Sequence, residues 1–242
     1  MSDELLIVTA VAPESRAVLA AVRHAKRIAL PGFRAWSGDA GGRPVRIVQS
    51  GIGPARARAA LAALDTRHGR ILSVGFAGAL AAESQPGDVV LPTAVVWEEA
   101  TGLARYPVPR AFRGMVAERI PPRLAARLLA GTLLSSPVVV ASVAEKRAAA
   151  LRCDAVAVEM EAAAVIAYAA ERGADVLPLR VILDTADVSL VGLPPDLDAS
   201  WRARARLAAR PALWGRALAL ARHVPHVAAV LGQTLAAVLP QL

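Results

Sequence analysis

The stretch at residues 155–170, AVAVEMEAAAVIAYAA, constrains the fold more than any other part of the sequence. Its first half alternates, and a strand there would place the carboxylates of Glu159 and Glu161 on one face. From Glu161 onward the residues are small and apolar until Glu171, which is typical of a buried helix because a surface helix carries a polar side. The stretch therefore predicts an internal strand followed directly by an internal helix, with two carboxylates at their junction.

Carboxylates at such a junction indicate a function, because a buried charge costs several kcal/mol unless it is paired or hydrogen-bonded. The alternative is that Glu161 is a favourable charge at a helix N-terminus and that Glu159 is a partly exposed strand residue. A second stretch favours the functional interpretation: residues 176–183 (VLPLRVIL) predict a buried strand that leads into Asp184. Ligands of open α/β sheets bind at the carboxyl ends of strands, so Asp184 is a candidate for chemistry.

Strand and helix patterns alternate along the rest of the chain. Strands are predicted at residues 5–11, 45–49, 71–74, 89–97 (with Pro92 at a bulge or edge) and 137–143, with a short edge strand around Trp36. Helices are predicted at residues 15–28, 55–68 (ending at Gly69), 121–130 and 144–152, whereas residues 101–119 have no clear period and are interpreted as a flap or a connection. No linker interrupts this order, so we expect one α/β domain over residues 1–242, with a parallel or mixed sheet covered by helices.

Two loops of small residues follow predicted strands. Residues 50–54 (SGIGP) follow the strand at 45–49, and the two glycines let the backbone approach a ligand next to a helix N-terminus, which suits an anion or a hydroxyl group. Residues 75–79 (GFAGA) predict a second loop at the same sheet edge. Glu14, which follows the first strand, is expected at that edge as well.

Composition limits the class of protein. Of the 242 residues, 55% are hydrophobic, 20% are charged and 4% are aromatic, which is typical of a folded chain with a core of Ala, Val and Leu. Cys153 is the only cysteine, which excludes an internal disulfide framework and a cysteine metal cluster, and we expect no metal. The first residues, MSDELLIVTAVA, carry acids where a signal peptide would be basic, so we expect a cytoplasmic protein.

The C-terminal tail, residues 199–242, is basic and apolar. The net charge is +8, and no acid follows Asp198. The arginines of the tail are Arg202, Arg204, Arg206, Arg210, Arg216 and Arg222. Residues 225–240 are too short, at roughly 1.5 Å per residue, to cross a hydrocarbon core of roughly 30 Å. The tail is either a last helix packed on the sheet, which we favour, or an interfacial segment that meets a membrane or an apolar substrate.

Five segments resemble, in order, the superfamily of purine nucleoside phosphorylases and methylthioadenosine/S-adenosylhomocysteine nucleosidases. They are LLIVTAVAPES, VRIVQSGIGPARARAAL, ILSVGFAGAL with PGDVVLP, VAVEMEAAAV and LRVILDTAD. The resemblance implies a three-layer α/β/α sandwich around a central mixed sheet and cleavage of the N-glycosidic bond of a nucleoside. It also implies a homo-oligomer and no cofactor.

The resemblance implies roles for the acids at the strand ends. Asp184 matches the acid that protonates or hydrogen-bonds N7 of the purine, which requires a carboxyl whose pKa is raised by its pocket. Glu14 matches the acid that orients the attacking water in hydrolytic members. Val143 and Ala144 are expected to provide backbone contacts to the base.

The sugar is expected to contact the stretch at residues 155–170. Glu161 matches the glutamate that binds the ribose hydroxyls, Met160 matches the residue that packs against the sugar, and Glu159 is a further ribose candidate. Fixing the ribose helps its ring flatten toward an oxocarbenium-like transition state, which a nearby carboxylate stabilises.

The nucleophile is expected between the two small-residue loops. We assign a phosphate or water site to Ser50, Gly51, Gly53, Gly75 and Phe76. Phe76 stands where the family usually carries Ser or Thr, and the arginine of the phosphate-using members is missing just before that loop. Phosphate binding by the family's route therefore stays open.

Within the superfamily, the short chain and the tail rich in Arg, Leu and Pro most resemble the hopanoid-associated phosphorylases. This implies phosphorolysis of adenosylhopane, with inorganic phosphate as co-substrate and a lipid-linked substrate taken from a membrane through the tail. The alternative is a hydrolytic nucleosidase that acts on methylthioadenosine, S-adenosylhomocysteine or futalosine, which Glu14 and the missing phosphate arginine favour.

A third hypothesis is a nucleic-acid- or membrane-binding module that uses the basic tail. The run of Glu14, Glu161 and Asp184 argues against it, because a binding module has no need of buried acids at strand ends. We expect no nucleic-acid partner.

Overall fold

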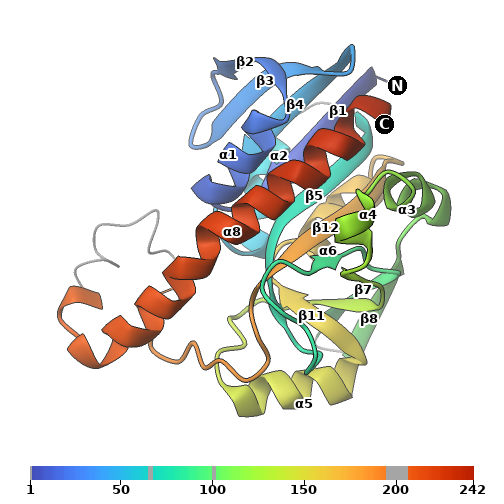
Figure 1. The fold of residues 1–242 in the computed structure, drawn as a ribbon. Coiled ribbons are helices and arrows are strands. Elements are labelled where there is room, and N and C mark those ends of the chain that lie inside the picture. Colours follow the sequence, from blue (N-terminus) through green and yellow to red (C-terminus); the bar gives the residue numbers. More distant parts are fainter. Residues whose placement is uncertain (1, 65–67, 100–101, 195–206) are drawn as a thin grey trace.

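The computed structural model describes residues 2–64, 68–99, 102–194 and 207–242, and the strands within them form one mixed twelve-stranded sheet with helices on both faces (Figure 1). Nine strands lie in the order β2 (Arg23–Ile28), β3 (Arg34–Ala40), β4 (Arg43–Gln49), β1 (Ser2–Thr9), β5 (His68–Ala79), β11 (Ala155–Glu159), β10 (Thr132–Ser135), β7 (Ala94–Glu99) and β8 (Gly102–Pro107). Off this path, β12 (Asp175–Asp184) pairs with β5 and with β6 (Val89–Val90), which pairs with β9 (Leu128–Leu129). The helices are α1 (Ala12–Ala20), α2 (Pro54–Leu64), α3 (Arg110–Ala117), α4 (Pro122–Ala125), α5 (Val143–Cys153), α6 (Ala162–Ala170) and α8 (Trp214–Val238), with short 3₁₀ turns at η1 (Pro211–Leu213) and η2 (Leu239–Gln241).

Strand β1 shows how the layers form. Its side chains alternate between the two faces of the sheet. Leu5 and Ile7 pack in the core cluster that includes residues of α1 and α8, whereas Leu6 and Val8 pack in the cluster that includes residues of α2 and α6. The predicted α/β fold, with a central mixed sheet between helical layers, is thereby confirmed.

The centre of the sheet is the long strand β5. It pairs in parallel with β1 at its start, in parallel with β12 along most of its length, and antiparallel with β11 at its end. The predicted loop at residues 75–79 is wrong, because β12 provides a ladder partner for this glycine-rich segment: Arg180 lies opposite Gly75, and Asp184 lies opposite Gly78. This pairing brings the carboxyl end of β12 against the backbone of β5.

Two predicted helices end earlier than expected. The helix predicted at residues 15–28 ends at Ala20, and residues 23–28 form the exposed edge strand β2, because β3 offers them a ladder. Trp36 lies in a strand as predicted, although β3 is one strand in from the edge. The helix predicted at residues 55–68 ends at Leu64, and Gly69 lies inside β5 rather than at a helix cap.

The middle of the chain departs most from the sequence prediction. The strand predicted at residues 89–97 is interrupted around Pro92 and becomes β6 and β7. Residues 102–107 pair with β7 and α3 buries Phe112 and Val116, so the described part of the predicted flap is a strand and a helix. The helix predicted at residues 121–130 reduces to α4 followed by β9.

No strand forms at residues 137–143 either. The strand of this region is β10, whose four residues are buried between β7 and β11. Val138 is 66% exposed. Within the part of the chain that the structure describes, residues 138–140, the run of three valines, have no neighbouring strand with which to form backbone hydrogen bonds.

Helix α8 divides into two halves. Its second half buries the predicted stripe at helical spacing: Val227, Val230, Leu231, Thr234, Leu235 and Val238. Its first half extends beyond the sheet (Figure 1), with Trp214 53% and Leu218 54% exposed. Trp201, Arg202, Arg204 and Arg206 lie outside the described residues. Across the part of the chain that the structure describes, no helix is long and apolar enough to cross a membrane.

Candidate active site

A cavity of about 1210 Å³ lies at the carboxyl ends of several strands. It is reached by Gln49 at the end of β4, by Glu159 at the end of β11 and by Asp184 at the end of β12. Glu14 and Glu161 line it as well. The structure thus brings together Glu14, Glu161 and Asp184, which the sequence placed at or just after strand ends, with Glu159 as a fourth acid.

Glu14 is held by the backbone around it. Its Oε2 accepts hydrogen bonds from the N–H groups of Ala10 (2.7 Å) and Val11 (3.0 Å), and its Oε1 accepts one from Phe76 (2.8 Å). A Cβ atom on Gly75 would lie 2.6 Å from Oε1, so only glycine lets the carboxylate lie against β5. Burial raises the pKa of Glu14 more than the backbone N–H groups lower it.

Glu161 joins the stretch at residues 155–170 to the loop at residues 50–54. Its Oε1 accepts a hydrogen bond from Gly53 N–H at 2.6 Å. Gly51 and Gly53 have φ angles of 87° and 95°, in the left-handed region that favours glycine. Burial, together with the charge of Glu159, raises the pKa of Glu161 to about 8.

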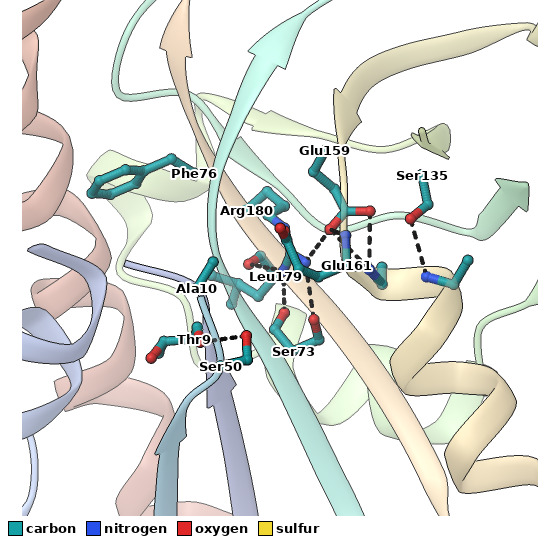
Figure 2. Close-up of polar contacts among 12 residues, drawn as sticks. Thr9, Ala10, Ser50, Ser73, Phe76, Ser135, Glu159, Glu161, Leu179 and Arg180 are labelled. Atoms are coloured by element: carbon teal, nitrogen blue, oxygen red, sulfur yellow. Dashed lines mark hydrogen bonds and ion pairs between the residues drawn. The ribbon is translucent and has the colours of Figure 1, made fainter. Parts of the chain in front are cut away.

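The carboxylate of Glu159 is paired with groups of the protein itself. Its Oε2 is 2.5 Å from a guanidinium nitrogen of Arg180. The same oxygen accepts hydrogen bonds from the backbone N–H groups of Glu161 (3.0 Å) and Ala162 (2.9 Å) at the start of α6. Figure 2 shows Arg180 between Glu159 and Ser73, whose hydroxyl lies 2.9 Å from the guanidinium. Glu159 therefore caps α6 and neutralises Arg180, and its assignment to the ribose stays a prediction.

Asp184 has a cationic partner that the sequence analysis missed. Nζ of Lys146, on α5, is 2.5 Å from Oδ2 of Asp184. Burial raises the pKa of Asp184 more than Lys146 lowers it. Arg180 was also missed, although a single cation in an otherwise apolar strand is a signal for a buried ion pair; Lys146 gave no such signal among the other charged residues of its helix.

The residues assigned to phosphate or water separate into three groups. Gly51 and Phe76 line the cavity. The Ser50 hydroxyl is fully buried, within hydrogen-bond distance of the carbonyls of Thr9 (3.1 Å) and Gly51 (2.8 Å), as Figure 2 shows for Thr9. Gly53 and Gly75 support Glu161 and Glu14.

The two residues expected to contact the base lie outside the lining of the cavity. Val143 and Ala144 form the first turn of α5 and are not among the residues that line the cavity. The preceding segment, residues 138–140, lines it instead. Met160 lines it as well, and its packing against the sugar stays a prediction.

Three arginines that the sequence analysis did not single out also line the cavity: Arg27, Arg34 and Arg56. Arg56 is oriented by a hydrogen bond of 3.1 Å to the Ser50 carbonyl and lies over the Phe33 ring, 5.1 Å from its centroid. Among the described residues, neither Arg27 nor Arg34 has an acidic partner within ion-pair distance.

A family model described as the phosphorylase superfamily matches residues 4–210. The chain belongs to the phosphorylase superfamily. It is therefore an enzyme of the nucleoside phosphorylase and nucleosidase type, which acts on N-glycosidic bonds. The superfamily implied by the resemblance is confirmed, whereas the hopanoid-associated family stays a prediction.

Solved structures share the fold of this superfamily member. A 5′-methylthioadenosine/S-adenosylhomocysteine nucleosidase from S. pneumoniae, bound to a transition-state inhibitor, has a TM-score of 0.79 at 18% identity, with 98% of this chain and 99% of that chain covered. The corresponding enzyme from Neisseria meningitidis has a TM-score of 0.76 at 20% identity, with 99% and 100% covered. The futalosine hydrolase of Helicobacter pylori has a TM-score of 0.77 at 18% identity, with 100% and 99% covered. No curated protein matches the chain in sequence.

Proposed function

We propose that the protein cleaves the N-glycosidic bond of an adenine nucleoside with a large apolar 5′ substituent, such as adenosylhopane, and that inorganic phosphate is the nucleophile. The observation that carries the proposal is the convergence of Glu14, Glu161 and Asp184 on one cavity at the carboxyl ends of the strands. Membership of the phosphorylase superfamily supports the bond type. No step of the proposed reaction needs a cofactor.

The leaving base receives its proton from Asp184. Burial raises the pKa of this carboxyl, which favours the protonated form that a general acid needs. As the bond to the sugar breaks, its electron pair goes to the purine and N7 takes the proton. The base then leaves as a neutral molecule.

The sugar is bound between Glu161 and Met160, which line the same cavity. Glu161 is fixed by Gly53 N–H, so its second oxygen is available to a ribose hydroxyl. Positive charge on the ribose in the transition state favours the ionised form of Glu161. This stabilisation is greater in the transition state than in the ground state because the positive charge develops only as the N-glycosidic bond breaks.

Phosphate as the nucleophile is supported by the arginines at the cavity. Arg27 and Arg34 have no acidic partner within the described residues, and Arg56 is oriented next to Gly51. Guanidinium groups bind phosphate oxygens in pairs. These three arginines would bind phosphate in place of the family's arginine, which is missing just before residues 75–79.

The size of the cavity supports a large substituent. Its volume of about 1210 Å³ exceeds the roughly 300–1,000 Å³ of ordinary small-molecule sites. One wall is apolar and comes from the first half of α8 and from the segment that follows β12: Leu190, Leu193, Ala217, Leu220, Ala221 and Val224. An apolar polycycle on the 5′ carbon has a matching surface there.

Contact with a membrane is supported by apolar side chains around this wall. The exposed ones are Val138, Val139, Val188, Val191, Trp214 and Leu218, of which the first two also line the cavity. Helix α8 carries Arg216 and Arg222 and no acid. Apolar side chains beside arginines bind the surface of an anionic bilayer, from which a lipid-linked nucleoside is taken.

A hydrolytic nucleosidase is the second candidate, and one observation favours it. Glu14 is buried at the cavity with a raised pKa, which suits a base that takes a proton from water. The structural neighbours at 18–20% identity include hydrolytic nucleosidases, although at this identity the likeness supports the fold alone.

The test is mass spectrometry of the products from adenosylhopane and from methylthioadenosine, each with and without phosphate. We expect adenine and a phosphorylated ribosyl hopane, formed only when phosphate is present. Adenine and a free sugar formed from methylthioadenosine without phosphate would establish the hydrolytic candidate. No base released from either nucleoside under any condition would overturn both.

A further inference from the structure

Lys146 is the largest fully buried side chain of the molecule within its described residues. It lies one turn into α5, after a capping box in which Ser142 and Glu145 bind each other's backbone N–H groups at 2.8 and 3.1 Å. The other cations of this helix, Arg147 and Arg152, are exposed. A single lysine turned inward, on a helix whose first turn is fixed, requires a specific acceptor.

The ammonium group of Lys146 has three acceptors, all at the end of β12 or just after it. Nζ is 2.5 Å from Oδ2 of Asp184, 2.7 Å from the carbonyl of Thr185 and 2.9 Å from the carbonyl of Val188. An ammonium has three N–H donors and no acceptor, so this arrangement fits the charged form with each proton used.

The contact distinguishes the two oxygens of Asp184. Oδ2 accepts from Lys146, whereas Oδ1 has no hydrogen-bond donor among the described residues. Behind the carboxyl lies Gly78 of β5, where a Cβ atom would be 3.2 Å from Oδ2 and 3.4 Å from Oδ1. The carboxyl is therefore held between an ammonium and a strand backbone, with one oxygen available to a ligand in the cavity.

We propose that Lys146 is a positioning residue for Asp184: by occupying Oδ2 it leaves Oδ1 as the oxygen that carries the acidic proton to N7 of the purine. The inference rests on the function proposed above. When the N-glycosidic bond breaks, its electron pair goes to the purine and the Oδ1 proton moves to N7. The carboxylate that remains is paired with the Lys146 ammonium, whose own three protons stay in place.

The charge of Lys146 also sets the pH range in which this acid works. It opposes the effect of burial and keeps the pKa of Asp184 lower than burial alone would. The other charged groups nearby are Glu161 and the Glu159–Arg180 pair at the cavity, and Asp187, whose pKa is lowered mainly by the hydrogen bond from Thr185 and to a smaller extent by Lys146. Removing the ammonium raises the pKa of Asp184 further, so the acid becomes weaker and stays protonated to a higher pH.

The test compares Lys146→Met with Arg147→Met, which removes a neighbouring exposed cation from the same helix. Each variant is assayed across pH with an ordinary purine nucleoside and with an N7-methylated one, whose base already carries the positive charge and needs no proton. We expect Lys146→Met to lower kcat for the ordinary nucleoside by about 100-fold or more. We also expect it to move the alkaline limb to higher pH and to lower kcat for the methylated nucleoside far less. Arg147→Met is expected to match the wild type.

A second variant covers the case in which Lys146→Met does not fold. In Lys146→Ala, added propylammonium is expected to restore part of the lost kcat at saturating substrate, and an equal concentration of a neutral alcohol is not. Equal losses on both nucleosides, with an unmoved pH limb and no rescue by the amine, would show that Lys146 only supports the fold. A wild-type enzyme that releases no purine at all would instead overturn the proposed function, and with it this role.

Discussion

At the residue scale, three carboxyls share one physical situation and differ in what holds them. Burial raises the pKa of Glu14, Glu161 and Asp184. Backbone N–H groups hold Glu14, the N–H of Gly53 holds Glu161, and the ammonium of Lys146 holds Asp184. Because the partners differ in charge, the three acids are able to take different roles in one cavity.

Replacing Asp184 with Asn is expected to abolish base release. The amide retains an oxygen for Lys146 but is too weak an acid to protonate N7, so kcat should fall by about 10²–10⁴-fold. The matched control is Asp187→Asn, an exposed acid of the same segment. Release of adenine is followed by absorbance, and circular dichroism checks the fold. Wild-type turnover in the Asp184 variant would remove this residue from the mechanism.

Gly75→Ala is expected to displace Glu14. The new Cβ would lie 2.6 Å from Oε1 of a carboxylate that three backbone N–H groups hold in place. We expect kcat/KM to fall at least about tenfold and stability to fall by about 1–3 kcal/mol. Gly114→Ala, where nothing lies within 4 Å of the new atom, is the control and should leave activity unchanged. Full activity in Gly75→Ala would mean that the position of Glu14 is unimportant.

At the element scale, α8 joins the core to the cavity. Its second half is buried against the sheet, and its first half lines the apolar wall while exposing Trp214 and Leu218. One helix thereby couples the stability of the fold to the shape of the cavity, and substitutions in its two halves should have separate effects.

Filling the apolar wall is expected to change substrate preference. Ala221 and Ala219 are both exposed, but only Ala221 lines the cavity. Ala221→Trp should lower kcat/KM for an adenine nucleoside with a large apolar 5′ group by about tenfold or more, because a rigid ring takes its space. Methylthioadenosine should be affected less. Equal effects on both nucleosides, or equal effects from Ala219→Trp, would contradict an apolar subsite at α8.

The exposed face of α8 is expected to bind anionic vesicles. The double substitution Trp214→Asp and Leu218→Asp removes two exposed apolar side chains and adds like charge to a face that meets an anionic surface. Sedimentation with phosphatidylglycerol vesicles should fall several-fold. Leu151→Asp, at a position 83% exposed on α5, is the control. Unchanged sedimentation, or an equal loss with Leu151→Asp, would argue for another use of the exposed face, such as contact with a second copy of the chain.

The elements that the sequence predicted well are those with a clear run or period of apolar residues. Residues 45–49 and 176–183 are buried strands with partners on both sides, and their apolar patterns indicated this. Strand β2 has no apolar period and forms because β3 offers a ladder, while the valines at 138–140 have strand propensity but no neighbouring strand. The three acids were found because each follows a buried strand. Lys146, the partner of Asp184, was missed because it comes from a different element, α5, and the pairing of Arg180 with Glu159 joins two strands that are distant in sequence.

At the scale of the whole molecule, the buried acids link the enzyme's stability to pH. A carboxyl with a raised pKa binds more protons when folded than when unfolded, so the stability it contributes is present at low pH and is lost as pH rises. For Glu161 the range is from the ordinary pKa of 4.5 to about 8, and Glu14 and Asp184 act in the same direction. Assembly into a homo-oligomer stays a prediction, and the linkage is expected whether or not it forms.

Glu161→Gln is therefore expected to be more stable than the wild type at pH 9 and close to it at pH 5. At pH 5 both side chains are neutral and similar in shape, whereas at pH 9 the wild type alone has to bury a charge beside Glu159. A shift of one pKa unit is worth about 1.4 kcal/mol, so the difference in unfolding free energy at pH 9 should be a few kcal/mol in favour of the variant. Thermal and urea unfolding at the two pH values measure it.

Glu145→Gln is the control with the opposite sign. Hydrogen bonds at the N-terminus of α5 lower the pKa of Glu145, so removing its charge should not stabilise the protein at pH 9. A Glu161 variant that differs from the wild type by the same amount at both pH values would mean that burial does not raise the pKa of this carboxyl in the empty cavity.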